Sequence, residues 1–367
     1  MKQRIVVGMS GGVDSSVAAA LLVEQGYEVV GITLRVWPWR EPDGARNRFG
    51  SCCSPETVDD ARQVARRLGI PYYLLNTEHE FDRTVIDNFA SEYRAGRTPV
   101  PCVVCNREVK FGSLLHRARA WEAVAVATGH YARLGQVPLT GRRLLLRGRD
   151  PRKDQSDFLW PLSQAQLAAA AFPVGDLTKE EVRAKARALG LPVAEKPESQ
   201  EICFIPDDDY RSFLRQRIPE GFRPGPILDR AGRRLGEHQG LAAYTVGQRR
   251  GLGLVSARPL YVMALDPRQN AVIVAEEEAL ESRRLVAADV NFIPFEWPAD
   301  EIRVSAKIRH RHSPAPALVR GVGERKVEVI FDTPQRAITP GQSVVFYDED
   351  LVVGGGVISD AAGFGSG

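Results

Sequence analysis

The chain has 367 residues, of which 44% are hydrophobic and 26% are charged, a composition typical of soluble globular proteins with two or three domains. Lys and Arg number 49 against 46 Asp and Glu, and the resulting net charge of +3 is too small to indicate a polyanionic partner by itself. No apolar run approaches the roughly 18 residues of a membrane span, and five cysteines, an odd number, argue against a disulfide scaffold. We therefore expect a cytoplasmic protein with no membrane partner.

The first feature in chain order is a strand, a glycine-rich turn and a helix. The apolar run Ile5–Val7 is typical of a buried strand, and the segment Val17–Gln25 is typical of a helix. Between them lies Gly8-Met9-Ser10-Gly11-Gly12-Val13-Asp14-Ser15-Ser16, which predicts an anion site because backbone N–H groups and the helix dipole converge there. The turn lacks the Lys of an ordinary P-loop, so we expect its serines to donate hydrogen bonds and Asp14 to cap the helix or bind Mg²⁺.

Strands and helices alternate over residues 1–205, which predicts an α/β fold with a doubly wound parallel sheet. Ligands bind such sheets at the carboxyl ends of the strands, so the first turn, Leu34 and Gly129 fall on one rim suited to an adenine nucleotide. The further strands expected are 27–36, 71–76 and 123–128, and the further helices are 55–68 (with Ser54 as N-cap), 81–93, 106–122 and 160–190, in which Thr178 and Glu181 have the spacing of a capping box.

The pattern changes beyond about residue 206, where turn signals become frequent and the apolar runs become short. We expect a small central domain of mixed structure over 206–280 and a C-terminal β-barrel over 281–360. The expected barrel strands are 302–308, 317–320, 326–331, 343–347 and 352–358, and residues 361–367 are expected to form a disordered tail.

Three cysteines are candidates for chemistry. Cys102 and Cys105 form a C-x-x-C pair at the start of an expected helix, where the helix N-terminus lowers the pKa of a thiol. Cys203 follows about a hundred residues later, and sequence alone does not place it beside the pair. Structural, metal-binding, iron–sulfur and nucleophilic roles all stay open for these residues. Cys52 and Cys53 are interpreted as structural.

A basic segment, Lys307-Ile308-Arg309-His310-Arg311-His312, lies at the end of an expected strand. Strand alternation places Lys307, Arg309 and Arg311 on one face, which together with Lys153 could neutralise a nucleic-acid backbone. A solvated basic strand edge is an equally good interpretation.

Further motifs follow the glycine-serine turn along the chain: Cys52-Cys53-Ser54, Gly96-Arg97-Thr98-Pro99, Cys105-Asn106, Lys110-Phe111, Thr128-Gly129-His130-Tyr131-Ala132, Lys153-Asp154-Gln155-Ser156, Ile202-Cys203-Phe204-Ile205, Tyr244-Thr245-Val246-Gly247-Gln248-Arg249 and Thr339-Pro340-Gly341-Gln342. With these motifs in this order the chain resembles the tRNA-specific 2-thiouridylases, whose glycine-serine turn is the PP-loop of ATP pyrophosphatases. The resemblance covers nearly the whole chain and implies that O2 of the wobble uridine in tRNA is replaced by sulfur, with ATP and Mg²⁺ as cofactors.

The resemblance also implies roles for single residues. ATP would be bound by Gly8, Met9, Ser10, Gly11, Gly12, Val13, Asp14, Ser15, Leu34 and Gly129. Cys105 aligns with the family's nucleophile and Cys203 with its persulfide carrier, and the two would form a transient disulfide bond during turnover unless Cys105 attacks the base itself. The tRNA would be contacted by Val100, Pro101, Cys102, His130, Lys153, Asp154, Gln155, Arg309, His310 and Gln342. The partners implied are tRNA and a persulfide donor such as a cysteine desulfurase or a sulfur-relay protein.

One departure from the family pattern leaves alternatives open. Val100-Pro101-Cys102 stands where the family often has Asn-Pro-Asp, so the acid/base role of that Asp is unassigned here. Cys102 also makes the chain similar to related thiolases in which three cysteines, here Cys102, Cys105 and Cys203, hold a 4Fe-4S cluster. Two rival functions are a PP-loop ligase acting on a small metabolite and a non-catalytic RNA-binding protein.

Overall fold

The structure is a computed structural model that describes residues 2–38, 54–197, 202–205 and 209–360. The chain forms two compact units, each built from segments that are separate in the sequence. The first unit takes residues 1–85, 102–208 and 350–352, and the second takes 86–101, 209–349 and 353–367. Cys52, Cys53 and the expected tail lie outside the described residues. The division into domains 1–205, 206–280 and 281–360 stays a prediction.

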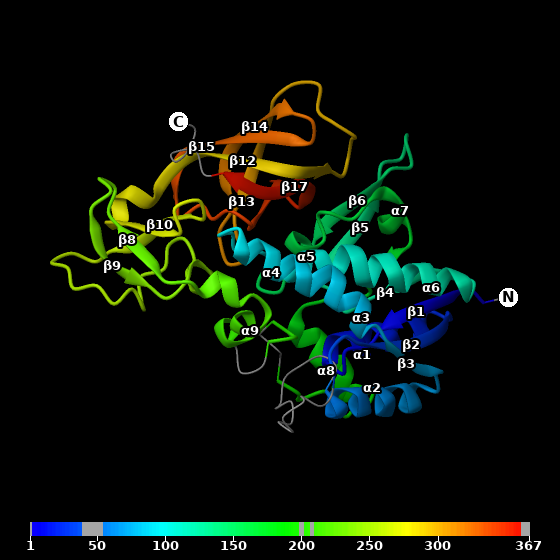
Figure 1. Cartoon of the computed structure of the whole chain (residues 1–367). Coiled ribbons are helices and arrows are strands. Elements are labelled where there is room, and N and C mark those ends of the chain that lie inside the picture. Colours follow the sequence, from blue (N-terminus) through cyan, green and yellow to red (C-terminus); the bar gives the residue numbers. More distant parts are fainter. Residues whose placement is uncertain (1, 39–53, 198–201, 206–208, 361–367) are drawn as a thin grey trace. The chain divides into compact units, whose positions relative to one another are not determined.

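The first unit is organised by a five-stranded parallel sheet of order β3-β2-β1-β4-β7, which confirms the predicted fold class (Figure 1). Successive connections run outward from β1 to β2 and β3 and then return to β4, so the order reverses between β1 and β4. This switch point is where an open α/β sheet binds its ligand. The strands are β1 (Arg4–Gly8), β2 (Glu28–Arg35), β3 (Tyr72–Asn76), β4 (Ala123–Ala127) and β7 (Ala170–Ala171).

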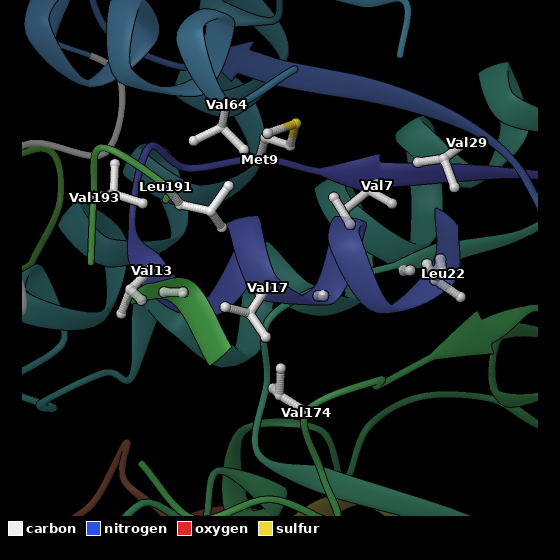
Figure 2. Packing of buried hydrophobic residues seen from close by; sticks show 14 of the residues in the cluster. Val7, Met9, Val13, Val17, Leu22, Val29, Val64, Val174, Leu191 and Val193 are labelled. Atoms are coloured by element: carbon white, nitrogen blue, oxygen red, sulfur yellow. The ribbon is translucent and has the colours of Figure 1, made fainter. Parts of the chain in front are cut away.

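Helices α1 (Val13–Glu24), α2 (Pro55–Leu68) and α8 (Lys179–Ala188) lie on one face of this sheet (Figure 1). Their apolar side chains interlock with those of β1 and β2 in a buried cluster to which Val7, Met9, Val17 and Val64 belong (Figure 2). α1 carries buried residues around most of its circumference, because it contacts the sheet, α2 and α8 together. Such burial fixes the start of α1 rigidly at the end of β1.

The two expected helices of residues 81–93 and 106–122 are present but interrupted by π-helical turns. The second consists of α5 (Pro101–Val104), the π-helical segment η2 (Cys105–Ser113) and α6 (Leu114–Ala120). The amide of Gln166 donates to the carbonyl oxygens of Arg107 and Phe111 in η2. π-Helical turns of this kind occur often at functional sites. The first consists of α3 (Glu78–Phe81), η1 (Asp82–Ile86) and α4 (Asp87–Arg94).

The prediction that residues 160–190 are helical is wrong in part. This stretch holds only α7 (Gln164–Ala168) and α8, with the short strand β7 and a turn between them. Ser163 and Thr178 each begin a helix with a complete capping box, the second as the sequence predicted. The hairpin of β5 (Ala132–Gln136) and β6 (Arg143–Arg147) and the short helix η3 (Ser156–Phe158) were not predicted.

The second unit contains a four-stranded sheet of order β10-β11-β8-β9 and a closed β-barrel. The sheet packs over a core that includes Ile227, Leu241, Tyr244 and Val272. The strands of this sheet and the helices next to them in the chain are α9 (Tyr210–Arg217), η5 (Pro219–Phe222), β8 (Gly225–Leu228), β9 (Arg234–His238), η6 (Leu241–Ala243), β10 (Tyr261–Asp266), β11 (Ala271–Ala275) and η7 (Glu277–Leu280).

The barrel has six strands in the order β12-β15-β14-β13-β16-β17 and is closed by pairing of β17 with β12, as the sequence predicted (Figure 1). Closure leaves no unpaired edge, and side chains such as Val304, Val319, Phe331 and Phe346 fill the interior. The strands are β12 (Glu281–Phe292), β13 (Ile302–Lys307), β14 (Ala315–Gly323), β15 (Lys326–Arg336), β16 (Ser343–Asp348) and β17 (Leu351–Asp360).

The expected basic strand face is wrong. β13 ends at Lys307, and Arg309 and Arg311 lie in the turn that follows, so strand alternation does not align these three side chains. Among the described helices, none combines the length and the apolar character needed to cross a membrane.

The glycine turn yields a stability test. Gly11 has a φ of 69°, and a Cβ built there would lie 2.2 Å from the carbonyl oxygen of Thr57. Gly69 has nearly the same φ of 67° with no atom within 4 Å of such a Cβ. We predict that Gly69→Ala lowers the free energy of unfolding by about 1 kcal/mol through backbone strain alone, and that Gly11→Ala lowers it by at least about 2 kcal/mol more because of the overlap. Urea denaturation of both variants measures this, and equal losses would contradict it.

Candidate active site

The glycine turn is held by β2 and by its own serines. The Met9 amide donates to Ile32 O at 2.7 Å, and Thr33 Oγ1 donates to Met9 O at 2.6 Å. The hydroxyls of Ser15 and Ser16 donate to Gly12 O at 3.3 and 2.8 Å. Gly12 is the N-cap of α1, and no side chain caps this helix. The first N–H groups of α1 therefore have no side-chain acceptor, which is the arrangement that receives an anion.

Asp14 does not cap α1, contrary to one expectation. Its carboxylate accepts two hydrogen bonds from Lys179 Nζ, at 2.7 and 2.8 Å, and one from Tyr131 OH at 2.7 Å. The Lys179 side chain is only 8% exposed, whereas that of Asp14 is 30% exposed. The backbone N–H of Lys179 donates to Asp150 Oδ2 at 3.1 Å, which fixes the first turn of α8.

A second lysine reaches the turn from the other side. Lys196 Nζ donates to Gly11 O at 3.0 Å and to Asp60 Oδ2 at 2.5 Å. Because the Gly11 backbone also packs directly on Thr57 of α2, the peptide between Gly11 and Gly12 is held on two sides. The turn therefore has two lysines supplied from distant parts of the chain, although its own motif has none.

Gly129 brings the end of β4 against the same turn. A Cβ on Gly129 would lie 2.5 Å from the backbone N of Ser15 and 3.0 Å from Asp14 Cβ, so only glycine fits there. Leu34 lies near the end of β2, which pairs with β1 in the same sheet. The structure thus places the glycine turn, Leu34 and Gly129 at the carboxyl ends of neighbouring strands.

The pKa of the Cys102 thiol differs from the one that the sequence predicted. It lies in α5, which has only four residues, and the residue is exposed. Desolvation raises the pKa of the Cys102 thiol, Asp157 adds to the rise, and Lys110 opposes it. The expectation of a lowered pKa is therefore wrong for Cys102, because loss of solvent outweighs the effect of so short a helix.

Cys203 lies in a turn anchored by its neighbours. Phe204 is 2% exposed and packs edge-on against Phe81 of α3 at a centroid distance of 5.6 Å. α3 also contacts η2, the segment that begins at Cys105. The segments that carry Cys203 and Cys105 therefore pack on the same short helix, and all three described cysteines are present as thiols without a disulfide bond.

A 4Fe-4S cluster would require the three cysteine thiols to lie together as ligands. Across the described ranges, no three His, Cys, Asp or Glu side chains gather in a way that could hold a metal ion. Cys102, Cys105 and Cys203 are all described, and they do not form the triad that a 4Fe-4S cluster requires.

His130 is a buried, neutral histidine. Its Nδ1 lies 2.7 Å from Thr128 Oγ1, and its ring packs near Phe111 and Phe172. Desolvation, with a smaller contribution from Lys110, holds the pKa of His130 well below its usual value. The ring therefore carries no charge at neutral pH with which to bind a phosphate.

Residues 153–155 form a hydrogen-bonded loop next to Tyr131. Asp154 accepts hydrogen bonds from the amides of Gly148 and Ser156 and from the Ser156 hydroxyl, and burial raises its pKa. Gln155 exchanges hydrogen bonds with the backbone of Tyr131, whose hydroxyl reaches Asp14. Asp154 and Gln155 thus shape the loop, and Lys153 lies half-buried next to them.

The remaining expected tRNA contacts belong to the second unit. Gln342 Nε2 donates to Thr98 O at 2.9 Å, and Gly341 approaches the Thr98 backbone so closely that a Cβ would overlap it. This contact brings Gln342 near the segment that leads to Val100 and Pro101. Arg309 donates to Arg336 O at 3.1 Å, and His310 is exposed in the same turn.

Lys179, Tyr131, Lys196 and Asp60 are the site residues that sequence reasoning missed. Lys179 directly follows the capping-box residue Thr178, so the sequence located its helix, but no pattern connects it with Asp14, 165 residues away. Tyr131 belongs to the motif Thr128–Ala132, but the sequence assigned no role to it.

A parallel sheet whose switch point carries an uncapped helix after a Ser-Gly-Gly turn defines a nucleotide-binding domain of the PP-loop type. Residues 3–207 match the family model described as the tRNA methyl transferase HUP domain, 211–276 match its PRC-barrel domain, and 282–358 match the aminomethyltransferase beta-barrel domain.

Two relatives are both called tRNA-specific 2-thiouridylase MnmA. The protein of Heliobacterium modesticaldum is 53% identical over 360 residues, which are 98% of this chain and 93% of the relative. That of Moorella thermoacetica is 53% identical over 357 residues, 97% of this chain and 99% of the relative. A solved 4-thiouridine synthetase–RNA complex with bound ATP is 18% identical over 59% of this chain and 51% of its own, with a TM-score of 0.34 that carries no weight. The chain belongs to the tRNA-specific 2-thiouridylase (MnmA) family.

The buried His130 predicts a pH dependence of stability. Below the ordinary histidine pKa of about 6.5 the unfolded chain binds a proton at this position and the folded chain does not, so the free energy of unfolding falls as the pH is lowered from 7 to 5. His130→Asn should reduce this slope by up to about 1.4 kcal/mol per pH unit. Urea denaturation at pH 7, 6 and 5 measures it. Burial also lowers the pKa values of His238 and His312, but these residues are present in both wild type and His130→Asn. Identical slopes of unfolding free energy against pH in the two proteins would therefore contradict the prediction.

Proposed function

We propose that the protein is a tRNA-uridine 2-sulfurtransferase that uses ATP and a cysteine persulfide to convert the wobble uridine of tRNA into 2-thiouridine. The single observation that supports the proposal is that one compact unit contains both features the reaction needs. These are the uncapped helix α1 after the PP-loop, and the segments of Cys105 and Cys203, which both pack on α3. Family membership over 98% of the chain supports the choice of tRNA as substrate.

In the proposed first step, O2 of the uridine attacks the α-phosphorus of ATP. A bond forms between O2 and phosphorus, the bond to the β-phosphate bridging oxygen breaks, and pyrophosphate leaves. Negative charge grows on the phosphates, where the N–H groups at the start of α1 and the turn of Gly11 and Gly12 supply donors. The described residues gather no ready cation site, so Mg²⁺ would arrive bound to the triphosphate.

In the proposed second step, the terminal sulfur of a persulfide on Cys203 attacks C2 of the base, and AMP leaves with O2. The Cys105 thiolate then attacks the Cys203 sulfur, so the electron pair of the S–S bond passes to the sulfur on C2 and a Cys105–Cys203 disulfide remains. A dithiol reductant restores the two thiols. A persulfide-bearing partner, such as a cysteine desulfurase or a sulfur-relay protein, then reloads Cys203.

The assignments of the other residues complete the proposal. Gly8 to Ser15, Leu34 and Gly129 form the ATP site, and Val100, Cys102, Lys153 and Gln342 contact the anticodon loop, from which the target base is splayed out. The raised pKa of the Cys102 thiol disfavours the thiolate form, so we assign the nucleophile to Cys105 instead. We place the protein in the cytoplasm, where thiols stay reduced.

The decisive experiment combines unmodified tRNA, ATP, Mg²⁺ and a labelled persulfide. Wild type should give 2-thiouridine, AMP and pyrophosphate, and Cys105→Ser and Cys203→Ser should lower thiolation to the assay background, since each removes a sulfur of the relay. Cys102→Ser is the matched variant: it should keep thiolation well above the assay background, because it removes no sulfur of the relay, and any loss should come from weaker tRNA contact.

Other outcomes assign other functions. Equal loss in all three cysteine variants, together with brown colour after anaerobic purification, would favour the cluster. Thiolation that survives Cys203→Ser would contradict the relay. Absence of pyrophosphate from wild type with tRNA present would favour a ligase for a small metabolite or a non-catalytic RNA-binding protein.

A further inference from the structure

Asp14 poses an electrostatic problem for the proposed ATP site. It lies in the first turn of α1, the turn that would receive the triphosphate, and its side chain is partly exposed. A carboxylate at this place attracts the positive end of the helix but repels a polyanion that must bind at the same N-terminus. An uncompensated Asp14 would therefore weaken the binding of ATP.

The structure contains the compensating charge. Lys179 Nζ hydrogen-bonds both oxygens of the Asp14 carboxylate, and Tyr131 OH donates a third bond to Oδ1. The Lys179 backbone is in turn fixed to Asp150, so the ammonium group is delivered from a rigid helix start. The side chain is almost fully buried, and a buried ion pair is weak evidence for a gain in stability because both groups lose solvent. Stability alone therefore does not account for the pair.

The same two helices carry a second ion pair of ordinary type. Lys185 of α8 lies 2.6 Å from Glu24 at the last turn of α1, and both side chains are substantially exposed. This pair lies at the opposite end of α1 from the glycine turn. Substitution of Lys185 is therefore a matched control, because Lys185 is also a lysine of α8 that pairs with α1 but lies away from the anion site.

We infer that Lys179 is a positioning residue of the nucleotide site, which neutralises Asp14 and, with Tyr131, holds its carboxylate so that a triphosphate can approach the N-terminus of α1. This inference rests on the proposed function, since it concerns the ATP site. It assigns to α8 the cation that the PP-loop motif itself does not contain. Its effect must scale with the charge of the ligand.

The test is equilibrium binding by isothermal titration calorimetry with Mg²⁺ chelated, so that a metal ligand role of Asp14 does not enter. Lys179→Met should weaken ATP binding by about 30-fold and leave adenosine, which has no phosphate, within about twofold of wild type. Lys185→Met should leave both ligands unchanged. Lys179→Arg, which keeps the charge, should lie closer to wild type than Lys179→Met.

The double variant separates charge compensation from a merely structural role. Asp14→Asn combined with Lys179→Met removes both charges and should restore ATP binding to within about threefold of wild type. Asp14→Asn alone leaves the positive charge of Lys179 and should bind ATP about tenfold more tightly than wild type. This measurement tests the inference even if the Lys179→Met variant does not fold.

The inference is overturned if wild type binds ATP and Lys179→Met binds it equally well, if the double variant does not recover, or if Asp14→Asn binds ATP more weakly. Loss of adenosine affinity in Lys179→Met equal to the loss of ATP affinity would also overturn it. Failure of wild type itself to bind ATP would instead refute the proposed function, so the two failures are distinguishable.

Discussion

The ion pair between Lys179 and Asp14 joins the parts of the first unit that meet at the switch point. Asp14 belongs to the first turn after β1, Lys179 to the start of α8, and Tyr131, which also bonds Asp14, to the segment after β4. Asp150 fixes the backbone at Lys179, and Gln155 fixes that of Tyr131. Two segments that are far from Asp14 in the sequence therefore meet at one carboxylate at the N-terminus of α1, and the loop of residues 150–155 holds both of them.

Close backbone contacts make this arrangement possible. Gly129 lies against the first turn of α1, and Gly11 lies against the start of α2, at distances that leave no room for a Cβ. A helix start that is clamped in this way loses little further freedom when a ligand binds, which reduces the entropic cost of ordering the site. The absence of a side-chain cap on α1 contrasts with the complete capping boxes of α7 and α8. The N-terminus of α1 is therefore left for another partner.

The thiols of the first unit fall into two kinds. Desolvation raises the pKa of the Cys102 thiol. Cys105 begins a π-helical segment, and Cys203 lies in a turn anchored by Phe204. The segments that carry Cys105 and Cys203 both pack on α3. Among the described residues, no group of three His, Cys, Asp or Glu side chains is arranged to hold a metal ion.

Patterns confined to short stretches of sequence determined the class of this protein. Alternating apolar runs predicted the parallel sheet, the Ser-Gly-Gly turn predicted the anion site, short runs predicted the barrel, and the ordered motifs indicated the family. Sequence reasoning missed β7, the β5–β6 hairpin and the π-helical turns, and it misplaced Arg309 on a strand, because these features depend on neighbours that local patterns do not contain. The tertiary structure alone decided that Asp14 meets Lys179, since burial of a lysine depends on a partner 165 residues away. It also decided that the pKa of the Cys102 thiol is raised, because a thiol's pKa follows from the atoms packed around it rather than from its position in a motif.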